Sequence, residues 1–318
     1  MSPEAGSRDR QRLARAALTW LAEPRDPHLA GLLGMCEPDE VLAAIRGGRL
    51  PAQCRDDSPG RVPGTTQALR RWQLRLRDLP DDDTITAACR DGIRLLCPDD
   101  AEWPAGLDDL GQERPYALWL RGSGDLSYGS VGSVSVVGSR AATGYGAYVG
   151  GELAAGLAGH GWQIVSGGAY GIDAAAHRGA LAAGGRTVAL LACGVDRPYP
   201  AGHDSLFASI AVGGLVASEW PPGSRPTRLR FLIRNSAIAA LTQGTVVVEA
   251  GQRSGALNTA RHAARLGRPL MAVPGPVTSA QSAGCHQIIR DLGAALVTST
   301  ADILNVLSGT PEPDQAGR

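Results

Sequence analysis

Arginine side chains, an aromatic ring and a polar loop gather in one part of the sequence, between residues 225 and 268. From Trp220 to Arg290 the chain has nine arginines and a single acid, Glu249, although its 31 basic and 31 acidic residues balance overall. A guanidinium group can bind a phosphate through two parallel hydrogen bonds. This local excess of positive charge predicts an anionic partner.

A helical wheel places Arg228, Phe231, Arg234 and Asn235 on one side of this segment. The opposite side is apolar and comprises Leu229, Leu232, Ile233, Ser236 and Ala240. A solvated ring between guanidinium groups offers a base a surface to stack on and offers the phosphates cations, as single-stranded nucleic acid requires. The alternative is a helix that begins after Phe231, with the ring in the core.

A second helix is predicted from Ser254, and it repeats this division into a basic and an apolar face. Its polar face comprises Asn258, Arg261, His262 and Arg265, and its small face comprises Ala256, Ala260, Ala263 and Ala264. Two neighbouring basic faces favour a binding surface over ordinary solvated helix surface.

These helices belong to a pattern in which apolar runs alternate with helical segments from residue 131 onward. The runs are 133–138, 162–167, 187–193, 214–219, 245–250 and 269–275. Continuous Val, Ile and Leu runs separated by helices predict an α/β fold with a doubly wound parallel sheet covered on both faces. The first four runs end at Gly138-Ser139-Arg140, Ser166-Gly167-Gly168, Cys193-Gly194 and Glu219, and the last two at Glu249-Ala250-Gly251 and Pro274-Gly275.

The carboxyl ends of parallel strands share one edge, where open α/β sheets bind ligands. Small residues at this edge admit a ligand close to the backbone, and helix N-termini behind them attract anions. The alternative for each loop is that glycine only makes a short turn. Taken together with the basic faces, the loops predict a binding edge.

Several common sites are excluded. The chain has no lysine, which rules out a phosphate-binding P-loop, and no G-x-G-x-x-G or G-x-S-x-G motif. Its six cysteines form no C-x-x-C pair and have no histidine at zinc-ligand spacing. We therefore expect no cofactor, no metal and a reducing compartment. Without a signal-like N-terminus or an apolar run of 18 residues, we expect a cytoplasmic protein with no membrane span.

Three segments are expected along the chain. Residues 1–85 are predicted as a small helical domain and linker, with a proline- and glycine-rich stretch at 50–63. Residues 86–308 are predicted as the α/β domain, preceded within it by short strands near 93–96 and 116–120. We expect no further module after Leu304 and a disordered tail at 309–318.

Two acids leave an enzymatic alternative open. Glu249 ends a strand and Asp173 lies near a helix start, so either could act as the acid or base of a nucleotide N-glycosidic hydrolase. Against this, an arginine partner is the expected role for Glu249, and an acid in the first turn, such as Asp173, usually serves the helix dipole.

Long motifs of this chain resemble, in order and spacing, the bacterial DNA-processing protein A family, also called Smf (DprA/Smf). The residues that carry the resemblance are 136–140, 166–181, 191–203, 218–223, 231–235 and 246–260. The resemblance covers residues 90–300 and implies an extended Rossmann-like domain, with the N-terminal helices as a sterile-alpha-motif-like domain. It also implies a homodimer that binds and protects single-stranded DNA and helps to load the RecA recombinase in natural transformation, without catalysis.

In the family, the turn matching Gly138 to Arg140 and the segment matching Arg228, Phe231 and Arg234 line the DNA pocket. Three positions depart from the family pattern: Ser236 stands in place of a second arginine, Ala256 in place of a serine, and Cys285-His286 in place of an asparagine. The candidate DNA-binding residues are therefore Gly138, Ser139, Arg140, Ser166, Gly167, Gly168, Arg228, Phe231, Arg234, Asn235, Ser254 and Gly255.

Overall fold

The computed structural model describes residues 3–54, 63–90, 92–126 and 132–309. The expected tail, apart from Gly309, and most of the expected linker lie outside these ranges. The contacts divide the chain into two compact units. Unit 1 holds residues 1–121, 192–197 and 217–227, and unit 2 holds residues 122–191, 198–216 and 228–318. The first unit thus includes the two short strands as well as the predicted helical domain; the boundary at residue 85 stays a prediction.

Unit 1 is mainly helical. Its helices are α1 (Pro3–Leu21), α2 (Pro27–Leu33), α3 (Pro38–Gly47), α4 (Thr65–Arg75) and α5 (Asp82–Arg90), with 3-10 helices at Ala52–Cys54, Leu76–Asp78 and Ala105–Glu113. The two predicted short strands form β1 (Ile93–Leu96) and β2 (Leu118–Arg121), and they pair antiparallel. The buried Trp119 ring meets Trp20 edge to face at 5.2 Å. Its indole N–H donates to the Thr19 hydroxyl at 3.2 Å, so this ring is both packed and hydrogen-bonded.

Unit 2 contains the parallel sheet that the apolar runs predicted. Its strands are β3 (Ser133–Val137), β4 (Gln163–Ser166), β5 (Thr187–Leu191), β7 (Gly244–Val247), β8 (Leu270–Ala272) and β9 (Ala295–Leu296). They lie in the order β5-β4-β3-β7-β8-β9, and the five pairs are all parallel. The fourth predicted run, 214–219, forms β6 (Leu215–Ser218). These observations confirm the α/β fold class.

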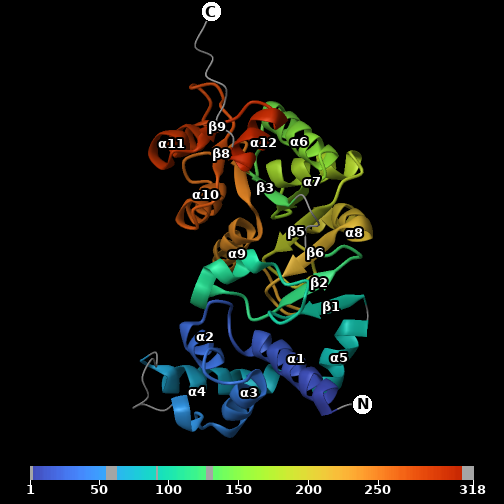
Figure 1. The fold of residues 1–318 in the computed structure, drawn as a ribbon, viewed down its shortest axis with the longest axis vertical. Helices are drawn as coiled ribbons and strands as arrows, with labels where there is room; N and C mark the ends of the chain where they lie inside the picture. Colours follow the sequence, from blue (N-terminus) through green and yellow to red (C-terminus); the bar gives the residue numbers. More distant parts are fainter. Residues whose placement is uncertain (1–2, 55–62, 91, 127–131, 310–318) are drawn as a thin grey trace, which may run out of the picture. The chain divides into compact units, whose positions relative to one another are not determined.

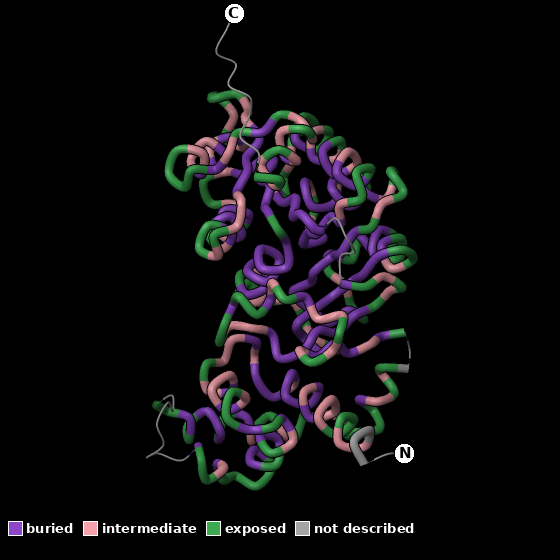
Figure 2. The backbone as a smooth tube through the Cα atoms, in the orientation of Figure 1, coloured by how far each residue is buried: buried purple, intermediate pink, exposed green. Residues whose placement is uncertain are grey.

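Helices cover both faces of this sheet (Figure 1). The helices after the strands are α6 (Gly144–Gly159), α7 (Ile172–Ala182), α8 (Asp204–Gly213), α9 (Arg228–Leu241), α10 (Ala256–Arg265), α11 (Ala283–Leu292) and α12 (Thr300–Ser308), with a 3-10 helix at Ala201–His203. Helices α6, α7 and α12 pack on one face, and α9 and α10 pack together on the other. Figure 2 shows strands β3, β4, β5, β7 and β8 as buried and the outer sides of the helices as exposed.

The core on the first face is aliphatic, with Val134, Leu153, Ile172, Met271 and Ile303 among its members. Each strand from β3 to β5 is buried along its whole length, which is why the sequence shows continuous rather than alternating apolar residues. None of the helices in the described ranges is both long and apolar enough to cross a bilayer.

Strand order reverses between β3 and β7. From β3 the chain proceeds through β4 to β5 on one side, and from β7 through β8 to β9 on the other. The loops that leave two adjacent strands at such a reversal diverge to opposite faces of the sheet, and open α/β sheets bind ligands in the crevice between them. The fold therefore directs attention to the carboxyl ends of β3 and β7.

A candidate nucleic-acid pocket at the strand-order reversal

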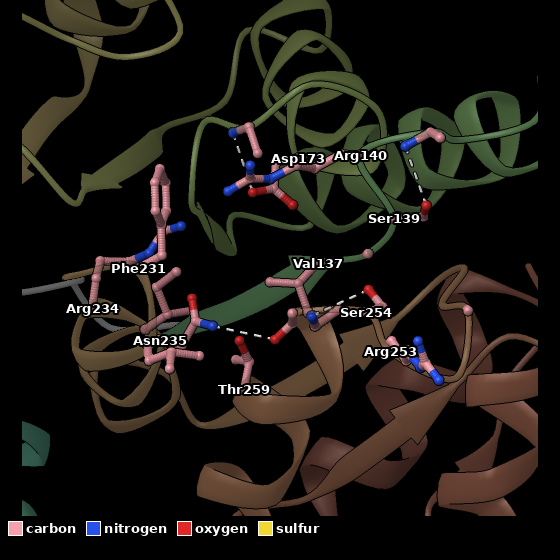
Figure 3. Close-up of a pocket in the computed structure, with 18 of the residues that line it drawn as sticks. Val137, Ser139, Arg140, Asp173, Phe231, Arg234, Asn235, Arg253, Ser254 and Thr259 are labelled. Carbon is pink, nitrogen blue, oxygen red and sulfur yellow. Dashed lines mark hydrogen bonds between the residues drawn. The ribbon is translucent and has the colours of Figure 1, made fainter. Parts of the chain in front are cut away.

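A cavity of about 740 Å³ opens at the carboxyl ends of β3 and β7, within unit 2. Its walls come from the loop after β3, the start of α7, helix α9, the loop after β7 and the start of α10 (Figure 3). Nine of the twelve candidate residues line it: Gly138, Ser139, Arg140, Arg228, Phe231, Arg234, Asn235, Ser254 and Gly255. Residues about 115 positions apart in sequence are thus brought together.

Exposed cations surround the opening. Arg140, Arg228 and Arg253 are solvent-exposed, and none forms an ion pair with a residue in the described part of the chain. The Arg140 guanidinium lies 4.6 Å from the centre of the Phe231 ring, close enough for a cation–π contact. Figure 3 shows Arg140 reaching toward Phe231, with Arg253 on the other side of the pocket. We call Arg140, Arg228, Phe231 and Arg253 the rim.

Beneath the rim lie buried polar residues. Arg234 is 4% exposed, and its Nη1 donates to the carbonyl oxygens of Gly167 and Leu190 at 2.7 and 2.5 Å. Ser166 is fully buried and donates to the Val136 carbonyl at 2.7 Å. We call Ser166, Gly167, Gly168, Asp173 and Arg234 the floor. Of these, Ser166, Gly167 and Gly168 do not line the cavity.

The helical wheel for α9 assigned its faces incorrectly. Leu229 is 61% exposed and Leu232 is also exposed, whereas Arg234 and Asn235 are buried. The reason is that α9 is enclosed on all sides from Ile233 to Leu241, so a division into a wet and a dry face does not apply there. The helix begins at Arg228, before Phe231, and the Phe231 ring is half-buried rather than part of the core.

The faces of α10 match the prediction more closely. Ala256, Ala260 and Ala263 are buried and Arg261 is exposed, although Ala264 is exposed as well. The two helices are joined by the Asn235 side-chain amide, which donates to the Gly255 carbonyl at 3.2 Å and to Asn258 at 3.3 Å. Asn235 thereby fixes one wall of the pocket. Arg261 and Arg265 do not line it.

The glycines of the strand ends serve internal packing. A methyl group at Gly138 would lie 2.5 Å from the Ile172 side chain, and one at Gly167 would lie 2.2 Å from the Arg234 guanidinium. Gly168 has φ +68°, and a methyl group there would meet the Phe207 ring at 2.6 Å. These residues are small because protein atoms approach them, not because space is left for a ligand.

The two candidate acids have different surroundings. Both oxygens of Glu249 accept hydrogen bonds from Thr143, one from its amide at 2.9 Å and one from its hydroxyl at 2.7 Å. Thr143 is the N-cap of α6 and also accepts from the Gly146 amide, so Glu249 braces a helix start. No arginine partner of Glu249 occurs among its hydrogen bonds to described residues.

Asp173 is the one acid among the residues that line the cavity. Burial raises the pKa of its carboxyl group, and the positive charge of Arg234 opposes that rise. The Ala169 amide donates to one of its oxygens at 3.3 Å. Asp173 is therefore part of the support for Arg234 and for the start of α7.

Buried His177 lies on the same helix. Its Nδ1 bonds the Thr187 hydroxyl at 2.7 Å, and that hydroxyl donates to the Ile164 carbonyl, so Nδ1 carries the proton. Burial, together with the charges of His203 and Arg234, lowers the pKa of His177 to about 3. The imidazole is thus neutral at neutral pH.

The three departures from the expected motifs have local consequences. Ser236 is buried and donates to the Ile233 carbonyl, Ala256 lines the pocket, and Cys285 is buried against the Val247 carbonyl. Burial raises the pKa of the Cys285 thiol to about 12. The thiol is therefore not a nucleophile at neutral pH.

Sequence reasoning did not assign Arg253 to the site, although it counted this arginine in the basic stretch. Its position three residues beyond Ala250, in the loop after β7, is the signal that identifies it, because that loop leaves the sheet at the reversal of strand order. Thr259 and Gln281 also line the pocket. Thr259 lies within the motif 246–260 but was not singled out there, and Gln281 lies outside the motifs.

The chain matches a family of known proteins. The model of the family described as DNA recombination-mediator protein A matches residues 94–308. A putative DNA processing protein DprA from Mycobacterium tuberculosis is 46% identical over 301 residues, which cover 92% of this chain and 74% of that protein. DNA processing protein DprA from Streptococcus pneumoniae is 42% identical over 202 residues, which cover 64% of this chain and 70% of that protein.

Two solved structures are similar to this one. The X-ray structure of DNA processing protein A from Streptococcus pneumoniae has a TM-score of 0.73 and 32% identity, over 93% of this chain and 96% of that chain. A structure of DNA processing protein A from Helicobacter pylori, described for its single-stranded DNA binding mode, has a TM-score of 0.61 and 28% identity. It covers 68% of this chain and 96% of that one.

Proposed function

Because the chain belongs to the DNA recombination-mediator protein A family, we propose that it is a single-stranded DNA-binding recombination mediator. Family membership confirms the resemblance seen in the sequence and assigns the chain a role in DNA processing and recombination. In the proposed function it protects incoming single-stranded DNA and helps to load the RecA recombinase in natural transformation. It acts in the cytoplasm as a homodimer, and by binding rather than by catalysis.

The observation that carries this proposal is the rim. Three exposed guanidinium groups without ionic partners in the described ranges line a pocket that also holds a half-buried aromatic ring and a single buried acid, and the Arg140 guanidinium contacts that ring. Phosphates of an unpaired strand bind the guanidinium groups of Arg140, Arg228 and Arg253, and the bases lie toward the aromatic side. No base edge is read, so binding is independent of sequence.

The structure of the Helicobacter pylori relative supports the choice of ligand, since it was solved to describe that protein's single-stranded DNA binding mode. The similarity between the two structures extends over 68% of this chain, which is many more residues than those that line the pocket. The homodimer and RecA parts of the proposal rest on what the resemblance in sequence to this family implies.

Fluorescence anisotropy tests the proposal directly. Labelled oligothymidylate and a duplex of equal length are titrated with the protein at two salt concentrations. We expect tighter binding of the single strand and a slope of log K against log salt of about −0.7 per neutralised phosphate. Equal affinity for both DNA forms, or an affinity that does not change with salt, would refute it.

The RecA part needs its own assay. Single-stranded DNA coated with a single-strand-binding protein is incubated with RecA, and ATP hydrolysis by RecA reports its nucleation on the DNA. We expect this protein to shorten the lag before hydrolysis begins. An unchanged lag, at protein concentrations that saturate the DNA, would remove RecA loading from the proposal and leave DNA binding in place.

The competing function is a nucleotide N-glycosidic hydrolase that uses Glu249 or Asp173. Hydrogen bonds from Thr143 to both Glu249 oxygens, and the burial of Asp173 beside Arg234, support the non-catalytic proposal. Incubation with nucleoside monophosphates decides between them, with chromatography for free base. Base release that is lost in Glu249→Gln or Asp173→Asn would establish the enzyme instead.

A further inference from the structure

Phe231 is poorly placed to receive a base by itself. The Arg140 guanidinium lies 4.6 Å from its ring centre and the Arg234 guanidinium 5.6 Å from it, while Tyr199 meets its ring at 5.9 Å with an interplanar angle of 66°. These three neighbours leave the ring half-buried. A base that stacked on Phe231 would have to displace at least one of them.

Tyr199 has the opposite properties. Its side chain is 44% exposed, and the edge-to-face contact with Phe231 is its one ring contact among the described residues. That contact anchors the tyrosine to the rim while much of its surface stays in water. An aromatic ring held in place by an edge contact is a surface on which a base can stack without prior rearrangement.

The turn that carries Tyr199 is held by a second aromatic side chain. Tyr170, which is also exposed, follows the pocket residue Ala169 and packs edge to face on His203 at a centroid distance of 4.6 Å. His203 in turn bonds the Gly168 carbonyl through Nδ1 at 3.0 Å. The floor loop 166–168 and the turn 199–203 are therefore linked, so the Tyr199 ring has a supported position.

We infer that Tyr199 forms a base-stacking platform outside the pocket, which extends the binding track for single-stranded DNA beyond the rim. The strand enters the cavity through its phosphate contacts with the arginines, and the base of a flanking nucleotide stacks on Tyr199. The inference rests on the proposed function, and it moves the principal stacking surface from Phe231 to Tyr199.

Base stacking and phosphate contacts differ in their dependence on salt. This difference shows whether a side chain contributes to binding by stacking on a base or by contacting a phosphate. Loss of a phosphate contact makes the plot of log K against log salt less steep, since fewer counterions are released on binding. Loss of a stacked base lowers affinity equally at all salt concentrations. Tyr199→Ala should therefore shift this plot downward without changing its slope.

The experiment compares wild type, Tyr199→Ala, Tyr199→Phe and Tyr199→Leu with oligothymidylates that carry one 2-aminopurine at successive positions. We expect Tyr199→Ala to bind about 5- to 10-fold more weakly, at the low end of measured base–aromatic stacking, with an unchanged salt slope. It should also lose the quenching of 2-aminopurine at one position. Tyr199→Phe should retain both properties, because its ring keeps a π face.

Tyr148→Ala is the matched control, because Tyr148 is a 69% exposed tyrosine on α6 that does not line the pocket. It should bind like wild type. Tyr199→Leu keeps apolar bulk against Phe231 but has no ring, so it should bind as weakly as Tyr199→Ala. Wild-type affinity in Tyr199→Leu would refute stacking, even if Tyr199→Ala had lowered the thermal stability.

Two failures can be told apart. If wild type binds the single strand and Tyr199→Ala binds within twofold of it with the same quenching pattern, the platform is refuted and the proposed function stands. If wild type binds no single-stranded DNA, the proposed function is refuted, and the platform with it.

Discussion

The floor and the rim of the pocket both contain arginine but use it differently. Arg234 in the floor gives two hydrogen bonds to carbonyl oxygens and is shielded from water, whereas Arg140 in the rim is exposed and contacts a ring. Both arginines belong to motifs that pointed to DNA. The comparison teaches that residues of one motif divide into those that build a site and those that face the ligand, and burial tells them apart.

The largest expected effect comes from the floor. Arg234→Ala removes the donor for the Gly167 and Leu190 carbonyls and leaves Asp173 without a neighbouring positive charge. Removing one member of a buried pair of opposite charges lowers the unfolding free energy by about 3–5 kcal/mol. Urea unfolding measures this change. Arg261→Ala on the exposed side of α10 is the control and should change stability by less than about 0.5 kcal/mol.

If Arg234→Ala were as stable as wild type but failed to bind DNA, Arg234 would contact the DNA, as the rim residues do, rather than support the pocket. The division between floor and rim would then be wrong at its central residue.

The next effect concerns the rim. Arg140→Ala should keep the wild-type melting temperature and bind single-stranded DNA about 10- to 100-fold more weakly, because a charge-assisted contact contributes about 1.5–3 kcal/mol. Its salt slope should be less steep by about 0.7. Anisotropy titrations at three salt concentrations measure both. Arg261→Ala removes the same charge from outside the pocket, and a loss of affinity equal to that of Arg140→Ala would show that only net charge matters.

A pH titration probes His177, whose pKa burial and the charge of the floor residue Arg234 help to lower, without altering the rim. The folded-state pKa of His177, about 3, is below its ordinary value, so the unfolded chain binds a proton more readily. This contribution to stability is complete above pH 6.5 and decreases as the pH falls, by about 1.4 kcal/mol per unit. The measurement is the difference in unfolding free energy between wild type and His177→Gln from pH 7 to pH 5. A difference that does not change with pH would mean that His177 is solvated.

The smallest effect should come from Arg253, on the far side of the rim from Phe231. We expect Arg253→Ala to weaken binding about 3- to 5-fold, close to the lower limit for one exposed phosphate contact, with unchanged stability. Arg253→Lys, titrated in the same assay, should restore most of the affinity because it restores the charge. Equal weakening in both variants would indicate a bidentate contact that only the planar guanidinium makes.

The sequence predicted the sheet because each inner strand is buried on both faces and bounded by glycine, as in 133–138 and 162–167. It missed β9, since a strand of two residues has no recognisable pattern. Arg140 could be predicted as a pocket residue from the rule for strand ends, whereas Ser254-Gly255 came from the family resemblance. The burial of Arg234 could not, because helix periodicity assigns faces only where one side meets water. The contact between Tyr199 and Phe231 joins residues 32 positions apart and leaves no trace in either local segment.

The hydrogen bonds between Glu249 and Thr143 connect the two halves of the sheet, which lie on either side of the strand-order reversal. Glu249 follows β7, whereas Thr143 starts the helix that follows β3, so one carboxylate ties together the first connection of each half. A strand of DNA that contacted Arg140 and Arg253 would bridge the same two connections from the solvent side. Bound DNA would then link these two connections at the solvent side, in addition to the internal link through Glu249. Amide hydrogen exchange along β3 and β7 should therefore slow when DNA is added.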